Sequence, residues 1–289
     1  MTRESIMHCK GTAMNGIRRS SAIWFLSLAF VFGAWGDAGA ARPLVIVTSP
    51  AVKEAIEALG KAFEAAHPDV VVQVAVDTSL DLRRTIAGME NQGRFFIGSG
   101  PIHLVAPGGD EVITRMEQKY YLLPEAKALY ATERLVLVAP ESLSDAPESF
   151  EALGRMESIR IAVADRTTRL GVETDRVLSA LGLKVKQLDL ASDQSGILDH
   201  VLSGQADVGI LFGQDAVRAQ QRVRIVATAP AGLYKSTPHS IAMERYCPDR
   251  RLCEEFLRFV TSSEGQSALK QLGYGPGKAP AAPVTVFIP

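Results

Sequence analysis

Cysteine and histidine are scarce in this chain of 289 residues, which has only three Cys and five His. These numbers exclude a zinc site built from several cysteines and a small fold that depends on many disulfides. An excess of one charge is also missing, because 31 basic residues stand against 32 acidic ones and the formal net charge is −1. Sequence-independent binding to nucleic acid needs many Lys and Arg contacts to phosphates, so we expect no nucleic-acid partner.

The remaining composition is that of an ordinary globular protein. Apolar residues make up 47% of the chain and charged residues 22%. At about 100–200 residues per domain, the length allows one large domain or two of moderate size. The histidines after residue 40 are scattered, and no two of them have the spacing of metal ligands. We therefore expect neither a metal site nor a cofactor.

One strongly apolar stretch, Ala22–Gly36, follows Arg18-Arg19 and precedes Ala38-Gly39-Ala40. A basic region, an apolar region and a small-x-small site in this order are typical of a secretory signal peptide. The stretch is shorter than the span of about 20 apolar residues that crosses a membrane. We predict a signal peptide over residues 1–40, cleaved after Ala40, and a periplasmic location. An uncleaved N-terminal anchor is the alternative, and Met14 is an alternative start.

Cleavage after Ala40 would leave two cysteines, Cys247 and Cys253. Two cysteines in an exported protein suggest a disulfide. Six positions apart on a regular helix, they would be too far from each other to bond. The bond therefore requires Cys247 to fold back before the helix starts.

Apolar β-branched runs alternate with helical patterns along the chain. Four times a predicted strand ends in a polar turn, and a segment with apolar residues three or four positions apart follows it. Such alternation is typical of parallel β-α-β units in an α/β protein. The predicted strands lie at 44–47, 70–76, 160–164, 185–190 and 208–212.

The predicted units fall into two groups. A strand at 135–138 separates the groups, and a strand, turn and strand over 223–243 lead back to the first. We predict one lobe from 42–137 with 230–289 and a second lobe from 138–229, joined by two crossings. Two short helices, at 250–260 and 263–272, follow the second crossing, and the last dozen residues are expected to form a loose tail.

The repeated turn between strand and helix suggests a binding site. Ligands of open parallel sheets bind beyond the carboxyl ends of the strands, and helix N-termini suit anions. Ser, Thr and Asp are also the usual helix caps, so each turn taken alone has a purely structural alternative. The predicted ligand-binding residues are Thr48, Ser49, Thr78, Ser79, Thr168, Arg169, Gln194 and Ser195.

Several segments resemble one known family. They are Val47–Ala51 with Phe63, the turn from Asp77, the strand Leu135–Pro140, Gly204–Ala216, and Ser263–Gly273 with Tyr274. Their order and spacing are similar to the molybdate-binding-protein branch of the periplasmic solute-binding proteins of ABC importers. The resemblance implies a two-lobed periplasmic-binding-protein (type II) fold, an ABC permease as partner, and no catalysis.

The resemblance also implies a set of ligand contacts, and this chain departs from it. A family Ser falls at Ala51, and a family Tyr hydroxyl falls at Phe212, which has no donor. The family's Ser in its second turn matches Ser79, and its backbone contact in the fourth turn falls near Gln194. Arg169 stands in the third turn, where its guanidinium can pair with two oxygens of a carboxylate, phosphate or phosphonate.

We therefore predict an exported, monomeric solute-binding protein for a small anion, either an oxyanion such as molybdate or a phosphonate or carboxylate. An exported sensor of the same fold, signalling to a membrane receptor, is the alternative. An exported hydrolase has less support, because the sequence offers no nucleophile paired with a base.

Overall fold

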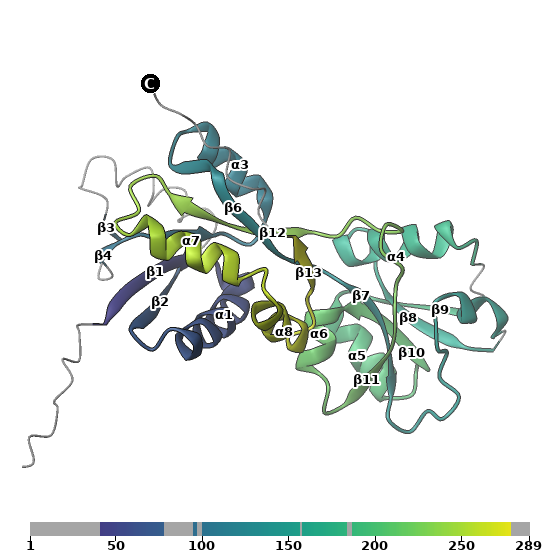
Figure 1. The fold of residues 1–289 in the computed structure, drawn as a ribbon. Coiled ribbons are helices and arrows are strands. Elements are labelled where there is room, and N and C mark those ends of the chain that lie inside the picture. The colour runs from purple at the N-terminus through teal and green to yellow at the C-terminus, as the bar shows by residue number, and fades with distance from the viewer. Residues whose placement is uncertain (1–40, 78–94, 97–99, 157, 184–186, 279–289) are drawn as a thin grey trace, which may run out of the picture. The chain divides into compact units, whose positions relative to one another are not determined.

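The computed structural model describes residues 41–77, 95–96, 100–156, 158–183 and 187–278, all within one compact unit, Gly39–Pro289. These residues form a mixed α/β structure with two main sheets (Figure 1). A short third pair joins β3 (Phe95–Phe96) to β4 (Gly100–Pro101). The predicted helix after Thr78 and the predicted signal peptide lie outside the described residues.

The first sheet has six strands: β1 (Arg42–Thr48), β2 (Val70–Val76), β5 (Leu104–Ala106), β6 (Leu122–Thr132), β12 (Pro238–Glu244) and β13 (Gly275–Lys278). Their order is β13-β6-β12-β5-β1-β2. The strands β2, β1 and β5 are parallel, whereas β12, β6 and β13 are joined by antiparallel pairing. The β-α-β pattern predicted β1 and β2 of the parallel half but not β5. The carboxyl ends of these parallel strands lie at one edge of the sheet.

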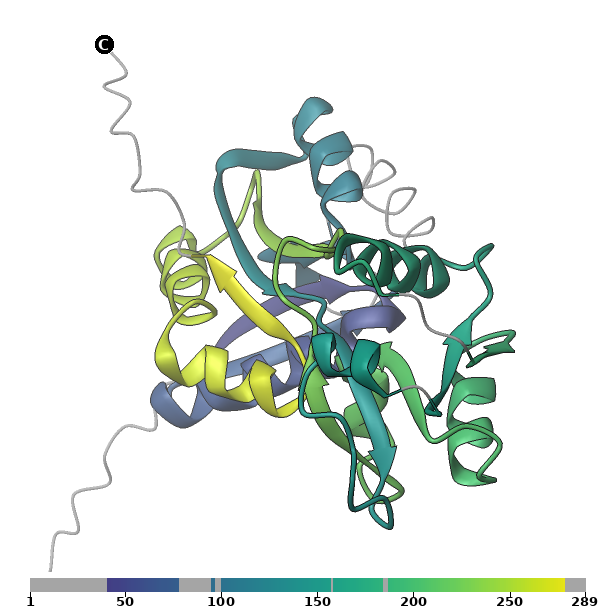
Figure 2. The same cartoon turned by 90° about the vertical axis from the view of Figure 1, so that its right-hand side faces the viewer.

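The second sheet has five strands: β7 (Leu135–Pro140), β8 (Arg160–Ala164), β9 (Gln187–Ala191), β10 (Val208–Phe212) and β11 (Val223–Thr228). Their order is β11-β7-β10-β8-β9. Here β9, β8 and β10 are parallel, and β7 pairs antiparallel with both β10 and β11. Figure 2 views the molecule from the side of this sheet.

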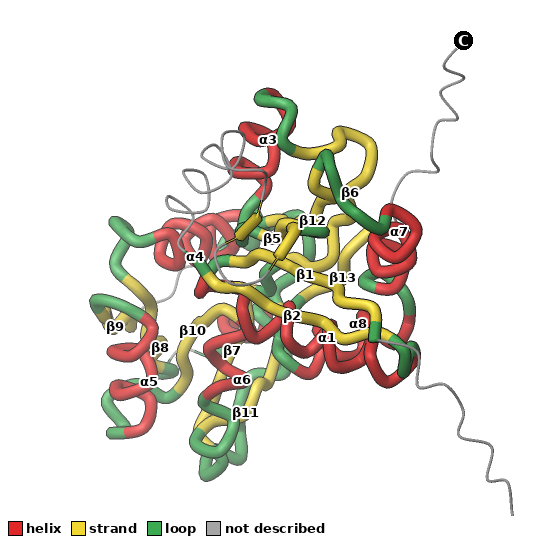
Figure 3. Tube along the Cα trace, turned by 90° about the vertical axis from the view of Figure 1, so that its left-hand side faces the viewer, coloured by secondary structure: helices red, strands yellow, loops and turns green. Residues whose placement is uncertain are grey.

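Helices cover both sheets. They are α1 (Lys53–Ala66), α3 (Asp110–Gln118), α4 (Arg169–Ala180), α5 (Gln194–Leu202), α6 (Gly213–Arg218), α7 (Arg250–Phe259) and α8 (Ser263–Gln271), with short 3-10 turns at Pro50–Val52 and Glu151–Arg155. The helices α1, α3, α7 and α8 pack on the first sheet, and α4, α5 and α6 pack on the second. Figure 3 shows α1 beside β1 and β2.

Each sheet carries its own apolar core. On the first sheet, alternate residues of β1 point to opposite faces, so Leu44 and Ile46 pack under α1 and α7 while Val47 packs toward α3. On the second sheet, β7 and β10 are buried along nearly their whole length. Strands buried on both faces explain the continuous apolar runs in the sequence.

The chain passes between the two sheets twice. It leaves the first sheet after Thr132 and returns to it at Pro238. By sheet membership, Leu135–Leu137, which we assigned to the first lobe, belong to the second sheet. The division into two moving lobes stays a prediction.

Two features at the C-terminal end bear on the expectations from sequence. Gly275–Lys278, next to and partly within the expected loose tail, pair with β6 as β13. A disulfide joins Cys247, which precedes α7, to Cys253 within that helix. Among the described residues, no helix is long and apolar enough to span a membrane.

Candidate functional site

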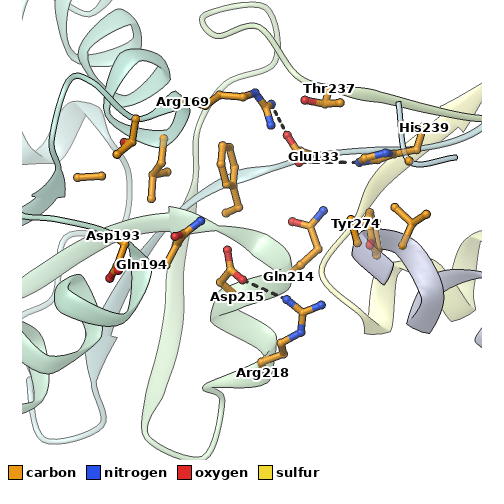
Figure 4. A pocket seen from close by; sticks show the side chains of 17 residues that line it. Glu133, Arg169, Asp193, Gln194, Gln214, Asp215, Arg218, Thr237, His239 and Tyr274 are labelled. Carbon is orange, nitrogen blue, oxygen red and sulfur yellow. Dashed lines mark hydrogen bonds and ion pairs between the residues drawn. The ribbon is translucent and has the colours of Figure 1, made fainter. Parts of the chain in front are cut away.

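A pocket of about 360 Å³ is lined by residues from the parts of the chain that build both sheets (Figure 4). One side comes from the turns after β1 and β5, and the other from the starts of α4, α5 and α6. The lining residues are Ala51, Val52, Gly108, Glu133, Ala164, Thr168, Arg169, Leu170, Asp193, Gln194, Phe212, Gln214, Asp215, Arg218, Thr237, His239 and Tyr274.

The start of α4 forms one wall of the pocket. Thr168 caps this helix: its hydroxyl accepts a hydrogen bond from the Gly171 N–H at 3.0 Å and donates one to the Asp165 carbonyl at 2.7 Å. A Cβ atom on Gly171 would lie 2.1 Å from that carbonyl, so only glycine permits this close approach. The first backbone N–H groups of a helix have no intrahelical acceptor, which makes this wall suitable for an anion.

The start of α5 lies on the same side of the pocket. The Asp193 carboxylate caps this helix by accepting a hydrogen bond from the Gly196 N–H at 3.0 Å. Both Asp193 and Gln194 line the pocket, whereas Ser195 is exposed and lies outside the lining set. A second helix N-terminus therefore faces the cavity, with an amide side chain beside it.

Arg169 makes two contacts inside the pocket. Its guanidinium pairs with the Glu133 carboxylate, and its central carbon lies 4.9 Å from the centroid of the Phe212 ring. Figure 4 shows the pair with Glu133 at the top of the pocket. The Arg169 side chain remains 44% exposed, so part of the guanidinium is open to a ligand.

A second arginine, Arg218 of α6, connects the two sides of the pocket. It lies 3.1 Å from the Asp215 carboxylate and 3.0 Å from the carboxylate of Glu54 in α1. Burial raises the pKa of Asp215, and the neighbouring Arg218 partly counters that rise. The pair of Arg218 with Glu54 joins a helix of the second sheet to a helix of the first.

Two buried residues of the pocket lining are His239 of β12 and Tyr274. His239 is 5% exposed, and neither of its ring nitrogens has a hydrogen-bond partner among the described residues. Its Nε2 lies 3.9 Å from Oε1 of Glu133. Burial lowers the pKa of His239, which keeps the imidazole neutral at pH 7, and burial raises the pKa of Tyr274 to about 12. Both side chains are therefore uncharged at neutral pH.

Three of the predicted binding residues, Thr168, Arg169 and Gln194, meet in this pocket. Thr78 and Ser79 lie outside the described residues. The structure brings the second-sheet residues of the prediction together except Ser195, which is on the exposed side of α5. Contact of any of them with a ligand stays a prediction.

Thr48 and Ser49 lie close to the pocket but outside its lining. The Thr48 hydroxyl is buried and donates a hydrogen bond to the Ala106 carbonyl at 2.8 Å, so it holds β1 to β5. Ser49 is buried behind Gly108, where an added Cβ would lie 2.7 Å from the Ser49 hydroxyl oxygen. The turn after β1 instead presents Ala51 and Val52 to the cavity.

At Ala51 and Phe212 this chain lacks the hydroxyl groups that the resemblance implies, and both residues line the pocket. Ala51 offers only a methyl group there. Phe212 offers an aromatic ring that supports the guanidinium of Arg169. The departures from the family pattern therefore fall on the cavity itself.

Sequence reasoning missed several lining residues: Glu133, Gln214, Asp215, Arg218, Thr237, His239 and Tyr274. A signal existed for two of them, because Gln214 and Asp215 directly follow a buried strand and open a helix, as the predicted turns do. Glu133, Thr237 and His239 lie at the two passages between the sheets, which no local pattern marks. Within the described part of the chain, no group of three His, Cys, Asp or Glu side chains could hold a metal ion.

Comparison with known proteins agrees with this arrangement. The molybdate-binding protein ModA of Mycobacterium tuberculosis and that of Mycobacterium bovis are each 24% identical to this chain over 239 residues, which cover 83% of this chain and 87% of theirs. A Clostridium difficile structure, described as the substrate-binding domain of a proposed molybdenum ABC transporter, shares 22% identity with a TM-score of 0.64. It covers 81% of this chain and 98% of its own.

These likenesses confirm the expected α/β fold of type II periplasmic binding proteins, with two sheets and two passages between them. The sequence model of the bacterial extracellular solute-binding proteins matches residues 44–275, which include all elements that line the pocket. The chain therefore belongs to the bacterial extracellular solute-binding protein family, and it is similar to molybdate-binding members of that family.

Proposed function

We propose that this protein captures a small anion in the pocket and delivers it to an ABC permease in the membrane. One observation carries the proposal: in a chain of a solute-binding family, the N-termini of α4 and α5 and two arginines line one pocket. Helix N-termini and guanidinium groups both favour negative charge. The proposed role is binding and transfer rather than catalysis.

The charges around the pocket define what kind of anion fits. Arg169 and Arg218 are each paired with carboxylates, Glu133 for the first and Asp215 for the second. The arginines are therefore partly neutralised before a ligand arrives. Such a site holds the oxygens of an anion mainly through directed hydrogen bonds. Molybdate, which the similar proteins bind according to their names, is one candidate, and phosphonates and carboxylates are others.

Two lobes are part of the proposal. We take the first sheet with its helices as one lobe and the second sheet, which includes all of β7, with its helices as the other, with the pocket between them. Closure of the lobes would exclude water from the pocket and strengthen each electrostatic contact with the ligand. The Arg218–Glu54 pair joins the two sides and would favour the closed arrangement.

Thermal-shift screening and calorimetry test the binding proposal. The purified protein is screened against molybdate, sulfate, phosphate, phosphonates, carboxylates and neutral sugars. A ligand at 100 times its dissociation constant adds about 2.7 kcal/mol to the free energy of unfolding if it binds only the folded protein. We expect at least one anion to raise the melting temperature and no sugar to do so. Stabilisation by a sugar alone would contradict the proposal.

Export is the other testable part. We propose that residues 1–40 are removed during secretion, so the mature protein begins at or near Ala41. N-terminal sequencing of protein from the periplasmic fraction should find that start. Recovery of a membrane-bound chain that retains Met1 or Met14 would contradict it.

A further inference from the structure

Two buried side chains that line the pocket, Gln214 at the start of α6 and His239 of β12, offer more unpaired hydrogen-bond acceptors than donors. Gln214 is 91% buried, since its exposed fraction is 9%, and its Oε1 has no partner among the described residues. Both ring nitrogens of His239 are unpartnered in the described part of the chain. A neutral imidazole has one donor nitrogen and one acceptor nitrogen. These two side chains therefore present two unpaired acceptors and one unpaired donor.

Buried polar atoms without a partner need one. A buried acceptor that stays unpaired costs about 1–3 kcal/mol, and native proteins rarely leave it so. In Figure 4 the amide of Gln214 lies between Asp215 and Tyr274. Gln214 hydrogen-bonds Tyr274 and lowers its pKa, so the amide N–H is the donor in that bond and Oε1 is the atom left unpaired. The guanidinium of Arg218 is held by Asp215 and Glu54. A ligand in the pocket is the natural source of the missing donor.

A bare tetrahedral oxyanion cannot donate a hydrogen bond to the unpaired acceptors of Gln214 and His239. Molybdate and sulfate carry no hydrogen at neutral pH, so they accept hydrogen bonds and cannot donate them. Such an anion could use the donors at the starts of α4 and α5, but it would leave Gln214 Oε1 unpaired. The volume of about 360 Å³ is also in the range of about 300–1,000 Å³ that is typical of sites for organic ligands.

We infer that the ligand is an organic anion that also carries a hydrogen-bond donor, a hydroxyl or an ammonium group, a few atoms from its anionic group. Its anionic oxygens lie toward Arg169 and Gln194, and its donor group lies toward Gln214 and His239. The inference rests on the proposed function, because it assumes that this pocket is the ligand site. It adds the class of ligand and the two side chains that select it.

Two matched series of ligands test the inference by calorimetry. One contains ethylphosphonate, 2-hydroxyethylphosphonate and 2-aminoethylphosphonate, and the other contains propionate, 3-hydroxypropionate and β-alanine. Molybdate and sulfate are the acceptor-only references. At least one substituted member should bind about tenfold or more tightly than its unsubstituted parent and than either reference, because a site built to accept a hydrogen bond rejects ligands that lack the donor. The series also distinguish phosphonate from carboxylate and hydroxyl from ammonium.

Matched variants identify the acceptor. Gln214→Met keeps the length of the side chain and removes its acceptor, so the advantage of the substituted ligand should fall below about threefold. Gln194→Met makes the same change at the start of α5 and should weaken parent and substituted ligand alike. If Gln214→Met does not fold, His239→Phe takes its place, because it keeps the ring contacts with Tyr130 and Tyr274.

The outcomes separate this inference from the proposed function. Binding of molybdate, sulfate or an unsubstituted parent as tightly as the substituted ligands would overturn the inference and leave anion binding standing. If the substituted ligand keeps its full affinity advantage over its parent in Gln214→Met, the assignment of Gln214 as the acceptor is wrong. Binding of none of these anions would overturn the proposed function and the inference with it.

Discussion

The guanidinium of Arg169 lies over the ring of Phe212, with its central carbon 4.9 Å from the ring centroid. Phe212 has the ring but not the hydroxyl of the tyrosine that the family resemblance places at this position. A cation over an aromatic face is held by the ring quadrupole, which limits where the guanidinium can point. The ring therefore orients a charged donor at a position that lacks the family's neutral donor.

Arg169→Ala should weaken anion binding by about tenfold, or about 1.4 kcal/mol. The substitution removes a guanidinium that is partly open to the pocket. Glu133→Gln is the matched opposite change, because it frees Arg169 from its carboxylate partner and should strengthen the binding of an anion. Titration calorimetry at constant ionic strength measures both. Equal affinities for the two variants and the unchanged protein would show that the ligand binds elsewhere.

Phe212→Tyr should improve the binding of molybdate. The added hydroxyl would supply a donor at the pocket surface, and one such hydrogen bond contributes about 1 kcal/mol, or about fivefold in affinity. Phe212→Leu adds no donor and should give no gain. If Phe212→Tyr binds molybdate no better than Phe212→Leu does, the ring does not face the ligand.

The stability of the protein should depend on pH through His239. Burial holds the pKa of His239 below its usual 6.5. Just below pH 6.5, His239 is therefore protonated in the unfolded chain but still neutral in the folded protein. The free energy of unfolding should therefore decrease as the pH falls through 6.5. Denaturant unfolding between about pH 7 and pH 5 measures the effect, and His239→Gln should lose less stability over this window. The same pH dependence in both proteins would assign it to other groups.

Gly213→Ala should destabilise the protein by about 1–3 kcal/mol. A Cβ atom at Gly213 would lie 2.3 Å from the Gly273 carbonyl oxygen, where the start of α6 meets the end of α8. Gly154→Ala is the control, because a Cβ there would meet only the tip of the flexible Leu183 side chain. Thermal unfolding compares the two, and equal melting temperatures would mean that the contact between Gly213 and Gly273 relaxes freely.

The sequence was informative where local patterns determine structure. Continuous apolar runs predicted β1, β8 and β10, because strands buried on both faces leave no polar alternation. A similar run predicted β2, although this edge strand is only partly buried. The strand β13 was missed, since Gly275–Lys278 contain no apolar side chain and are held by pairing with β6. Tertiary pairing of this kind leaves no local trace in composition.

The site was predictable only in part for a similar reason. Thr168 and Gln194 follow from the rule that polar turns open helices beyond parallel strands. His239 and Glu133 come from strands and passages whose neighbours are far away in the sequence, so chain topology rather than any motif brings them to the pocket. Gln214 follows a buried strand, but the helix at which it lies has only six residues and is too short to show an apolar periodicity.

A crystal structure of the protein with the anion that the screen identifies tests the central claim most directly. We predict electron density for the anion in this pocket, next to the starts of α4 and α5 and in contact with Gln214 and His239, with its oxygens within hydrogen-bond distance of Arg169 or Gln194. An anion bound with high occupancy at any place outside this pocket would contradict the account.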